Sequence, residues 1–314
     1  MQSKKISVII ATQDRLTLLT QCINGLAHQT YQDFELIIIN SGINKISKNL
    51  PLFKGLLQKI LKESLIIVNV SKKLVPPKAW NQGIKLSSGK IIAFIDDDAI
   101  ANNNWLKAIL TSFTLRPTIA AINGKIESVS SKTMSERIRQ TYYDFRDFMY
   151  SHGLFDLINK KQYRLQTTET NLADWLSMSN SAIQKKYLKR VQIFDERMSL
   201  NAGHKLGHEF MSNKLLVSYN SLAVVKHNHY RKIMHVLKIK IQNGIYLYNI
   251  DSEFRISSRK RFFETSKYIK YILQNKKLRW EDKIVESLFI FVQYGSYFYQ
   301  KLITFFKLKR RFIP

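Results

Sequence analysis

Three consecutive carboxylates, Asp96, Asp97 and Asp98, directly follow the apolar run Ile91–Ile95. An uninterrupted apolar run predicts a buried strand, so the three carboxylates stand together where that strand ends. Like charges packed this closely repel one another unless a cation or hydrogen-bond donors lie among them, and oxygen ligands suit Mg²⁺ or Mn²⁺. The triplet therefore indicates a divalent-metal site, with a solvated acidic turn as the plain alternative.

The segments around the triplet alternate between short apolar runs and amphipathic stretches. We expect strands at Ile6–Ala11, Phe34–Ile39, Leu65–Val70 and Ile91–Ile95, separated by helices at about Arg15–His28, Ile46–Lys62 and Lys78–Leu86. This alternation predicts an α/β fold with a doubly wound, mostly parallel sheet. Ligands of such sheets bind beyond the carboxyl ends of the strands, where Thr12–Arg15, Asn40–Gly42 and Asp96–Asp98 lie. We expect these three polar clusters to face one crevice.

The pattern is less regular in the second half of the chain. We expect helices near Asn102–Leu115 and Ser135–Tyr150, a polar loop to about Thr170, and strands near Ile119–Ile126, Leu172–Ile183 and Leu215–Val225. From Arg231 onward only helices are expected, and the composition changes to 19 Lys/Arg against 6 Asp/Glu. The last quarter of the chain is therefore a separate, basic region.

Four stretches occur in a characteristic order: Ile6–Arg15, Leu26–Gly42, Ala79-Trp80-Asn81-Gln82-Gly83 and Ser88–Asp98. Together they resemble glycosyltransferase family 2, whose members have the GT-A fold; the third is similar to the family's Ala-Arg-Asn-x-Gly, and the fourth to its strand leading into Asp-x-Asp. The resemblance covers about Ile6 to Tyr230. It implies a GT-A catalytic domain over residues 1–230, with a nucleotide-sugar half over about 1–100 and an acceptor half over about 101–230. The implied reaction moves a sugar from a nucleotide donor, with inversion at the anomeric carbon.

The resemblance also implies roles for the polar residues near the crevice. Asp96 addresses the ribose side of the nucleotide, Asp98 coordinates Mn²⁺ or Mg²⁺, and Asp97 supports them. The implied nucleotide-sugar residues are Thr12, Asp14, Arg15, Asn40, Asn81, Asp96 and Asp97. Asn40 stands where the family commonly has an Asp that accepts the base N3–H, so the donor base stays open, although a UDP-sugar is the first expectation. Trp80 stands where an Arg is common, and either stacks on a ligand or packs.

The acceptor side of the implied reaction needs a general base. Gly207-His208-Glu209 resembles the family's Gly-Glu-Asp segment, which makes Glu209 the expected base and His208 an unusual neighbour that tunes the base or merely packs. An ordinary carboxylate at a helix start is the alternative for Glu209. His227 and His229 follow a predicted strand where several GT-A enzymes have a histidine metal ligand, and either could complete the ion's ligands. Asn180 could orient the donor sugar or the acceptor.

The composition limits the class of partner and the compartment. The formal net charge is +27 over 314 residues, which favours anionic partners such as nucleic acid, anionic lipid or phosphorylated substrates. Cys22 is the single cysteine, so no internal disulfide can form and a reducing, cytoplasmic location is expected. No nucleic-acid motif occurs, so we expect no nucleic-acid partner. A nucleic-acid-binding protein and a nucleotidyltransferase on the same fold remain the rival functions.

The basic region over residues 231–314 is expected to be a helical, aromatic extension. Its stretch Ile284–Phe306 is apolar and aromatic but contains Glu286, Gln293 and Lys301, and it leads into Lys307-Leu308-Lys309-Arg310-Arg311. Such interruptions disfavour a membrane span and favour a helix that lies in the headgroup layer, with packing on the catalytic domain as the alternative. We therefore expect peripheral membrane contact through residues 284–311, at the inner face of the cell membrane. A glycan or lipid-linked oligosaccharide acceptor for surface polysaccharide would suit that place.

Overall fold

The computed structural model describes residues 6–46, 50–57, 65–70, 72–191, 193–198, 201–228, 232–254, 256 and 258–310. The chain divides into two compact units, one of Met1–Val129 with Asp147–Asn228, the other of Ser130–Arg146 with His229–Pro314. The second unit therefore includes residues 130–146, which the sequence analysis assigned to the acceptor half. The reason is that residues 130–146 include most of the helix Met134–Ser151, which packs with the C-terminal helices.

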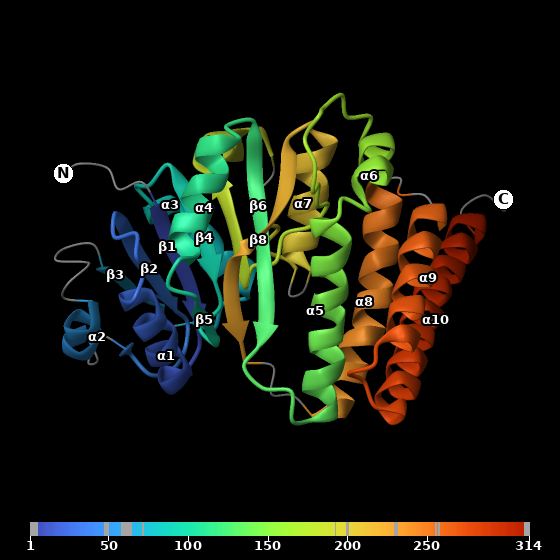
Figure 1. Ribbon diagram of the computed structural model, residues 1–314, viewed down its shortest axis with the longest axis horizontal. Coiled ribbons are helices and arrows are strands. Elements are labelled where there is room, and N and C mark those ends of the chain that lie inside the picture. The colour runs from blue at the N-terminus through green and yellow to red at the C-terminus, as the bar shows by residue number, and fades with distance from the viewer. Residues whose placement is uncertain are drawn as a thin grey trace. The chain divides into compact units, whose positions relative to one another are not determined.

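The first unit is built on one sheet of eight strands (Figure 1). The strands are β1 Ile6–Thr12, β2 Phe34–Asn40, β3 Leu65–Asn69, β4 Ile91–Ile95, β5 Ala99–Ala101, β6 Ile119–Ser128, β7 Asn180–Gln184 and β8 Leu216–His227. Their order in the sheet is β3-β2-β1-β4-β7-β6-β8-β5. The first four pair in parallel, as the alternating pattern predicts. The α/β fold class is confirmed.

Three helices connect the parallel strands: α1 Leu16–Ala27, α2 Leu50–Leu57 and α3 Pro76–Leu86. All residues of β2 and β4 are buried, which explains why their sequences are continuous apolar runs. Helix α3 lies against β1 and β2, and a Cβ at Gly83 would lie 2.6 Å from the Ile9 side chain. The chain moves from β1 outward to β3 and returns to β4 on the other side of β1. The point where the order reverses therefore lies between β1 and β4, where ligands of open α/β sheets bind.

The second half of the sheet departs from the expected parallel arrangement. β7 pairs antiparallel with both β4 and β6, and β5 pairs antiparallel with β8, while β6 and β8 are parallel. The three-residue strand β5 was not anticipated, because a strand of that length carries no periodic signal. The sheet is thus mixed, with its parallel part confined to the first four strands and the β6–β8 pair.

Two expectations for the middle of the chain were wrong. The predicted strand Leu172–Ile183 is a strand only from Asn180 onward, apart from a single bridge between Leu172 and Ser218. Its apolar residues are buried under helix α7, Ala202–Ser212, where Gly207 lets the helix approach the backbone at Trp175. The predicted loop before Thr170 contains helix α6, Asp156–Tyr163. Helix α4, Trp105–Leu115, and the 3₁₀ turn Lys185–Arg190 complete the unit.

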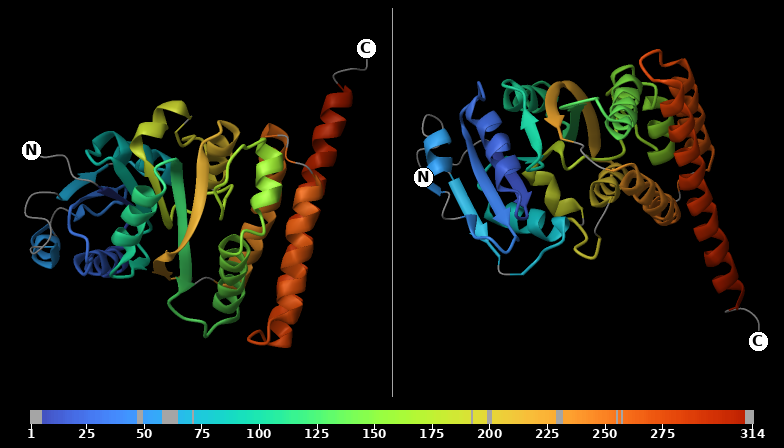
Figure 2. Two further views of the ribbon diagram at one scale, coloured as in Figure 1. Left: turned by 45° about the horizontal axis from the view of Figure 1, so that its top comes forward. Right: turned by 90° about the horizontal axis from the view of Figure 1, so that it is seen from below.

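The second unit is helical, as expected. It contains α8 Ile233–Phe254, α9 Ser258–Gln274 and α10 Trp280–Arg310, together with most of α5 Met134–Ser151. Figure 2 draws α10 as one continuous helix. No helix among the described residues is long and apolar enough to cross a membrane.

Ion pairs between helices hold the second unit together. Arg137 of α5 binds Asp282 of α10 through two hydrogen bonds of 2.7 and 2.8 Å. Lys240 of α8 and the Tyr268 hydroxyl of α9 both reach Glu286 Oε1, at 2.6 and 2.9 Å. Asp282 and Glu286 are fully buried. Removing one partner of such a pair would leave a buried charge unpaired, so these pairs specify how the four helices are turned toward one another.

Candidate functional site

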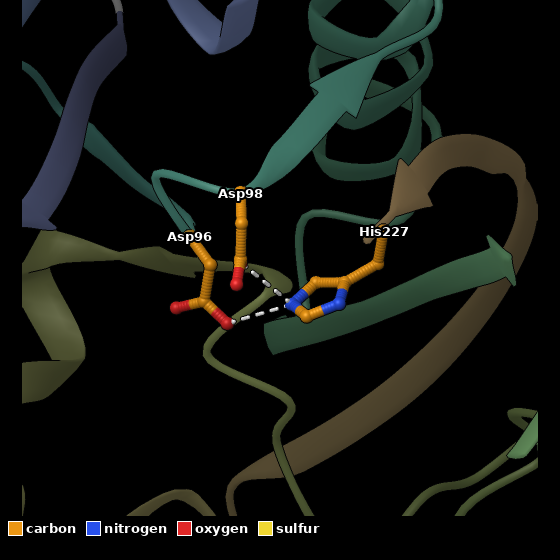
Figure 3. A group of neighbouring side chains, drawn as sticks. All are labelled: Asp96, Asp98 and His227. Atoms are coloured by element: carbon orange, nitrogen blue, oxygen red, sulfur yellow. Dashed lines mark hydrogen bonds and ion pairs between the residues drawn. The ribbon is translucent and has the colours of Figure 1, made fainter. Parts of the chain in front are cut away.

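The β5–β8 pairing brings a histidine to the carboxylates. Ala99, which directly follows Asp98, pairs with His227, and the Asn228 amide donates to the Asp98 carbonyl at 2.9 Å. As Figure 3 shows, His227 Nε2 lies between the two side chains, 3.1 Å from Asp96 Oδ2 and 3.1 Å from Asp98 Oδ1. The second candidate, His229, lies outside the described residues. Three donor side chains therefore meet at the exit of β4.

This cluster fits a divalent cation. The three donor atoms lie within 4.8 Å of one another. Adjacent donors in an octahedral shell with bonds of about 2.1–2.2 Å stand about 3.0–3.1 Å apart, which matches the distances from His227 to the two carboxylates. Asp98 Oδ1 is buried and, apart from its ion pair with His227, has no partner among the described residues. Two carboxylates and one imidazole are a donor set for Mn²⁺ or a related ion.

The charges within the cluster are strongly coupled. Burial of His227 opposes its charged form, but hydrogen bonds and attraction from Asp96 and Asp98 outweigh this and raise the pKa of His227 to about 9. Burial likewise opposes the charged form of Asp98, and the hydrogen bond and charge of His227 together with Arg15 outweigh it and lower the pKa of Asp98. In the metal-free protein a proton on His227 therefore compensates the carboxylates.

Asp97 has a different environment from its neighbours. It is fully buried, accepts a hydrogen bond of 2.6 Å from the Thr12 hydroxyl, and forms an ion pair with Arg15. Burial raises the pKa of Asp97 to about 6, against the opposing effects of Thr12 and Arg15. Arg15 also reaches Asp98 Oδ2 at 2.7 Å, and its side chain stays 45% exposed. Asp97 thus joins the end of β1 to the end of β4, and the partly exposed Arg15 lies beside both ends.

A residue that the sequence analysis did not select, Ser179, contacts Asp96. Its hydroxyl donates to Asp96 Oδ2 at 2.5 Å. The antiparallel register explains the contact, because Ile95 lies opposite Asn180. Asp96 follows Ile95 and Ser179 precedes Asn180, so these two residues also lie opposite each other. No local feature of the sequence could have revealed it, since the pairing joins segments more than 80 residues apart.

Asp14 and Asn40 organise the loop after β2. Asp14 has a φ of 53° and accepts hydrogen bonds from the backbone amides of Ile43 and Asn44, at 3.0 and 2.9 Å. Gly42 is required there, because a Cβ would clash with the Asp14 carboxylate. Asn40 is buried, donates to Asn69 Oδ1 at 3.0 Å and to the Asn44 carbonyl at 2.8 Å, and accepts from the Gly42 amide. Both side chains therefore shape the predicted nucleotide-side loop.

Asn81 and Trp80 connect α3 with the Phe194-Asp195-Glu196 turn. Asn81 Nδ2 donates to the Phe194 carbonyl at 2.9 Å, while its buried Oδ1 has no hydrogen-bond partner among the described residues. Trp80 packs on the Phe194 ring with centroids 5.1 Å apart, and Phe194 meets Phe94 of β4 edge to face at 5.6 Å. This contact favours packing, one of the two expected roles of Trp80.

Glu209 lies on α7 and is partly exposed. It lines a small pocket with Ile193, Phe194, Asp195, Ala202, Lys205 and Leu206. Phe194 therefore belongs both to this pocket and to the packing on Phe94, two residues before Asp96. His208, beside Glu209 in sequence, is buried and bonded to the Tyr163 hydroxyl. Of the two expected roles of His208, packing is the one that its surroundings favour.

Asn180 is bonded inside the protein on both sides of its amide. Its Oδ1 accepts from Trp105 Nε1 at 2.8 Å, and its Nδ2 donates to the carbonyls of Lys125 and Ala223, each at 2.7 Å. The side chain is 1% exposed. These contacts join β6, β7, β8 and α4, so they favour a structural role over the predicted contact with sugar or acceptor.

We expect Asn180→Ala to lower the free energy of unfolding by about 2–4 kcal/mol, because it removes three hydrogen bonds, two of them fully buried. Chemical denaturation monitored by circular dichroism measures this loss. Asn104→Ala is the matched control, since Asn104 is exposed and its side chain accepts one hydrogen bond, from Thr30. A stable Asn180→Ala variant that has lost sugar transfer would instead support contact with a ligand.

The mixed sheet, its flanking helices and the carboxylates at the reversal point define the GT-A class of folds. Residues 7–189 match the family described as glycosyl transferase family 2. The match covers more than half of the chain, and the chain belongs to glycosyltransferase family 2.

Curated relatives match shorter stretches of the chain. An uncharacterized glycosyltransferase of Rickettsia bellii is 36% identical over 108 residues, which are 34% of this chain and 15% of that protein. The GalNAc(5)-diNAcBac-PP-undecaprenol beta-1,3-glucosyltransferase of Campylobacter jejuni is 30% identical over 94 residues, which are 30% of this chain and 29% of the relative. The chain thus matches less than a third of the length of either relative.

Solved structures share the fold at low sequence identity. Staphylococcus aureus TarS, solved with UDP-GlcNAc, has a TM-score of 0.53 at 14% identity, covering 93% of this chain and 89% of that chain. A mannosyltransferase from Pyrobaculum calidifontis, solved with GDP-Man and Mn²⁺, has a TM-score of 0.54 at 12% identity, covering 96% of this chain and 74% of the other. These similarities establish the fold.

Proposed function

We propose that this protein transfers a sugar from a nucleotide-sugar donor to a hydroxyl group of an acceptor, with inversion at the anomeric carbon. The observation that carries the proposal is the meeting of Asp96, Asp98 and His227 at the reversal point of a family 2 sheet. Nucleotide-sugar transfer needs positive charge at the diphosphate leaving group, and this is where the chain can hold a cation.

On the donor side, Asp96, Asp98 and His227 would hold Mn²⁺ or Mg²⁺. When bound, the ion supplies positive charge that stabilises the diphosphate as it leaves. Arg15 lies next to Asp98 with a side chain that is 45% exposed, and in this proposal it would bind a diphosphate oxygen. Thr12 and Asp97 act as positioning residues, because they hold Arg15 and the carboxylate turn together. The Mn²⁺ complex of the structurally similar mannosyltransferase supports this arrangement.

The nucleoside would lie along the loop shaped by Asp14 and Asn40, with Asn81 on the opposite side. Asp14 and Asn40 act mainly by holding the backbone of residues 42–44, whose positions they determine through hydrogen bonds. Asn81 Oδ1 is buried and has no hydrogen-bond partner in the part of the chain that the structure describes. We favour a UDP-sugar as donor, and the UDP-GlcNAc complex of TarS supports that choice.

On the acceptor side, Glu209 would act as the general base. The acceptor oxygen attacks the anomeric carbon, its proton passes to the Glu209 carboxylate, and the bond from that carbon to the diphosphate oxygen breaks. The nucleoside diphosphate leaves with the bonding electrons. The pocket shared by Glu209, Lys205 and Phe194 is the candidate acceptor subsite.

The acceptor we favour is a glycan or lipid-linked oligosaccharide in surface polysaccharide synthesis at the inner face of the cell membrane. The names of two relatives support a lipid-linked acceptor: the undecaprenol glucosyltransferase of Campylobacter jejuni and the glucosyl-dolichyl phosphate glucuronosyltransferase of Haloferax volcanii, 23% identical over 124 residues. In this proposal residues 1–230 carry the reaction, and 231–314 serve the membrane contact.

A screen of nucleotide sugars with Mn²⁺ tests the proposal. We expect one donor to raise the melting temperature and to release its nucleoside diphosphate when an acceptor is added. Release of pyrophosphate would identify a nucleotidyltransferase instead. A salt-sensitive gel shift on oligonucleotides with no turnover of any nucleotide sugar would favour nucleic-acid binding and contradict the proposal.

We expect the affinity of the metal-free protein for Mn²⁺ to rise by up to about tenfold per pH unit below pH 9, because the ion must displace one proton. That proton sits on His227, whose pKa is raised to about 9 by the two carboxylates. Below this pKa the proton competes with the ion, and above it the imidazole is neutral and ready to coordinate. Calorimetric titrations at pH 6.5, 7.5 and 8.5 measure the trend. His227→Ala should bind Mn²⁺ weakly and with little pH dependence; an unchanged affinity in that variant would exclude His227 as a ligand.

A further inference from the structure

The exposed side of α10 is apolar along most of its length. Ile284, Leu288, Phe291, Phe298 and Leu302 are each 50–70% exposed, and we call these five residues the α10 stripe. Their spacings, completed by the exposed Gly295, alternate between four and three residues, which places them on one line of the helix. A Cβ at Gly295 would meet nothing within 4 Å, so no other part of the described protein covers the stripe at its middle. Soluble helices normally present the opposite pattern to solvent.

The other side of α10 holds two of its three carboxylates, and the third, Glu281, is partly exposed one turn before the stripe begins. Asp282 and Glu286 are fully buried and bonded to Arg137 and to Lys240 with Tyr268. Turning the helix over to hide the stripe would break both buried ion pairs, which is strongly unfavourable. The packing of the second unit therefore holds the stripe outward.

The charges around the stripe indicate what covers it. From Ile284 to Leu302 the single exposed charged residue is Lys301, and Lys276, Lys277 and Arg279 are exposed just before α10 begins. The sequence continues past the stripe with Lys307, Lys309, Arg310 and Arg311. In the sequence, cations therefore flank the apolar line on both sides. A second copy would bring like charges together, whereas an anionic lipid surface would neutralise them, with an affinity gain of about fivefold for each cation.

We propose that the α10 stripe binds an anionic lipid bilayer, with α10 lying parallel to the surface and the stripe turned toward the acyl chains. The line from Ile284 to Leu302 is about 27 Å long at 1.5 Å per residue, so it offers a long, shallow contact. The inference deepens the proposed function, on which it rests for the reason the protein would need a membrane. It assigns the contact to one face of one helix.

Vesicle flotation of the full chain tests this assignment. We expect binding to vesicles of phosphatidylcholine with 30% phosphatidylglycerol, and about a hundredfold weaker binding to phosphatidylcholine alone. Phe291→Glu should weaken binding to the anionic vesicles by about thirtyfold or more, because it removes a large apolar side chain from the stripe and adds a negative charge. Leu115→Glu is the matched control: Leu115 is 75% exposed at the end of α4 in the first unit, and its replacement should change binding less than twofold.

Trp280 provides a direct reporter at the start of α10. Of the four tryptophans it is the exposed one, at 69%, while Trp105 and Trp175 are buried and Trp80 is half-buried. We expect a blue shift of the fluorescence when anionic vesicles are added. Trp280→Phe should keep the binding and lose most of the shift.

Two results would overturn the inference. One is a Phe291→Glu variant that binds anionic vesicles as tightly as the unchanged protein. The other is a dimer, detected by sedimentation, that Phe291→Glu dissociates, while neither the unchanged protein nor the variant binds vesicles. That result would make the α10 stripe an interface between copies of the chain. Donor hydrolysis in the absence of lipid is measured in parallel. It should be unchanged in Phe291→Glu, so loss of the membrane contact and failure of the proposed reaction are told apart.

Discussion

Replacing Asp98 by asparagine is expected to lower kcat/KM for sugar transfer by about a thousandfold or more. Asparagine keeps the size of the side chain but removes a charged oxygen ligand beside His227. It also removes one of the two carboxylates that hold Arg15, which lies 2.7 Å from Asp98 Oδ2 and is paired with Asp97 as well. The cation is therefore held more weakly, and Arg15 is positioned by Asp97 alone. Release of nucleoside diphosphate with saturating Mn²⁺ and acceptor is the measurement.

The loss in Asp98→Asn should come from charge and not from unfolding. The change loses the ion pairs of Asp98 with Arg15 and His227 but also relieves repulsion from Asp96 and Asp97, so we expect the melting temperature in the presence of a chelator to fall by only a few degrees. Asp33→Asn, at an exposed loop position before β2, is the matched control and should keep full activity. An Asp98→Asn variant with unchanged kcat/KM would show that the reaction does not use this carboxylate.

The second large effect is expected for Glu209→Gln, which should lower kcat by about a hundredfold to ten-thousandfold. Glutamine fills the same place on α7 but cannot take up the proton of the acceptor hydroxyl. The ground-state contacts of the donor do not involve Glu209 in our proposal, so the dissociation constant of the nucleotide sugar should change little. Steady-state kinetics with varied acceptor, combined with donor binding by calorimetry, separates these two quantities.

A matched control for Glu209→Gln is Glu127→Gln. Glu127 lies on β6, is partly exposed and pairs with Lys125 at 3.3 Å, so its replacement removes a similar surface charge away from the pocket. We expect kcat to stay within about twofold there. If Glu209→Gln kept more than a third of the kcat of the unchanged protein, the base would have to be another residue, and Glu209 would be an ordinary helix carboxylate.

The first four strands were predictable because their signal is local. Residues of β2 and β4 are buried on both faces, and each strand therefore appears in the sequence as an unbroken apolar run. The second half of the sheet lacks such a signal. β5 has three residues, and the buried segment around Trp175 is apolar because it packs under α7 and not because it pairs in the sheet. Burial by itself does not distinguish these two environments.

The candidate site shows the same division. The carboxylates were predictable because they follow a recognisable strand, whereas the contact of Ser179 with Asp96 depends on the antiparallel β4–β7 register. Asn40 and Asn180 illustrate the converse. Their residue types suggested ligand contacts, but the hydrogen bonds of both amides join distant parts of the sheet and its loops. The predicted roles of Glu209 and of the nucleotide-side residues stay predictions.

The sequence by itself determined the α/β alternation, the family and the place of the acidic triplet, because each depends on residues close together in the chain. Only the tertiary structure brought His227 to Asp96 and Asp98, since Ala99 and His227 pair across more than 120 residues. It likewise decided that α10 buries Asp282 and Glu286 and exposes the α10 stripe. The histidine contact and the orientation of α10 both depend on which residues from distant parts of the chain pair with a charged side chain. The order of residue types along the chain does not contain that information.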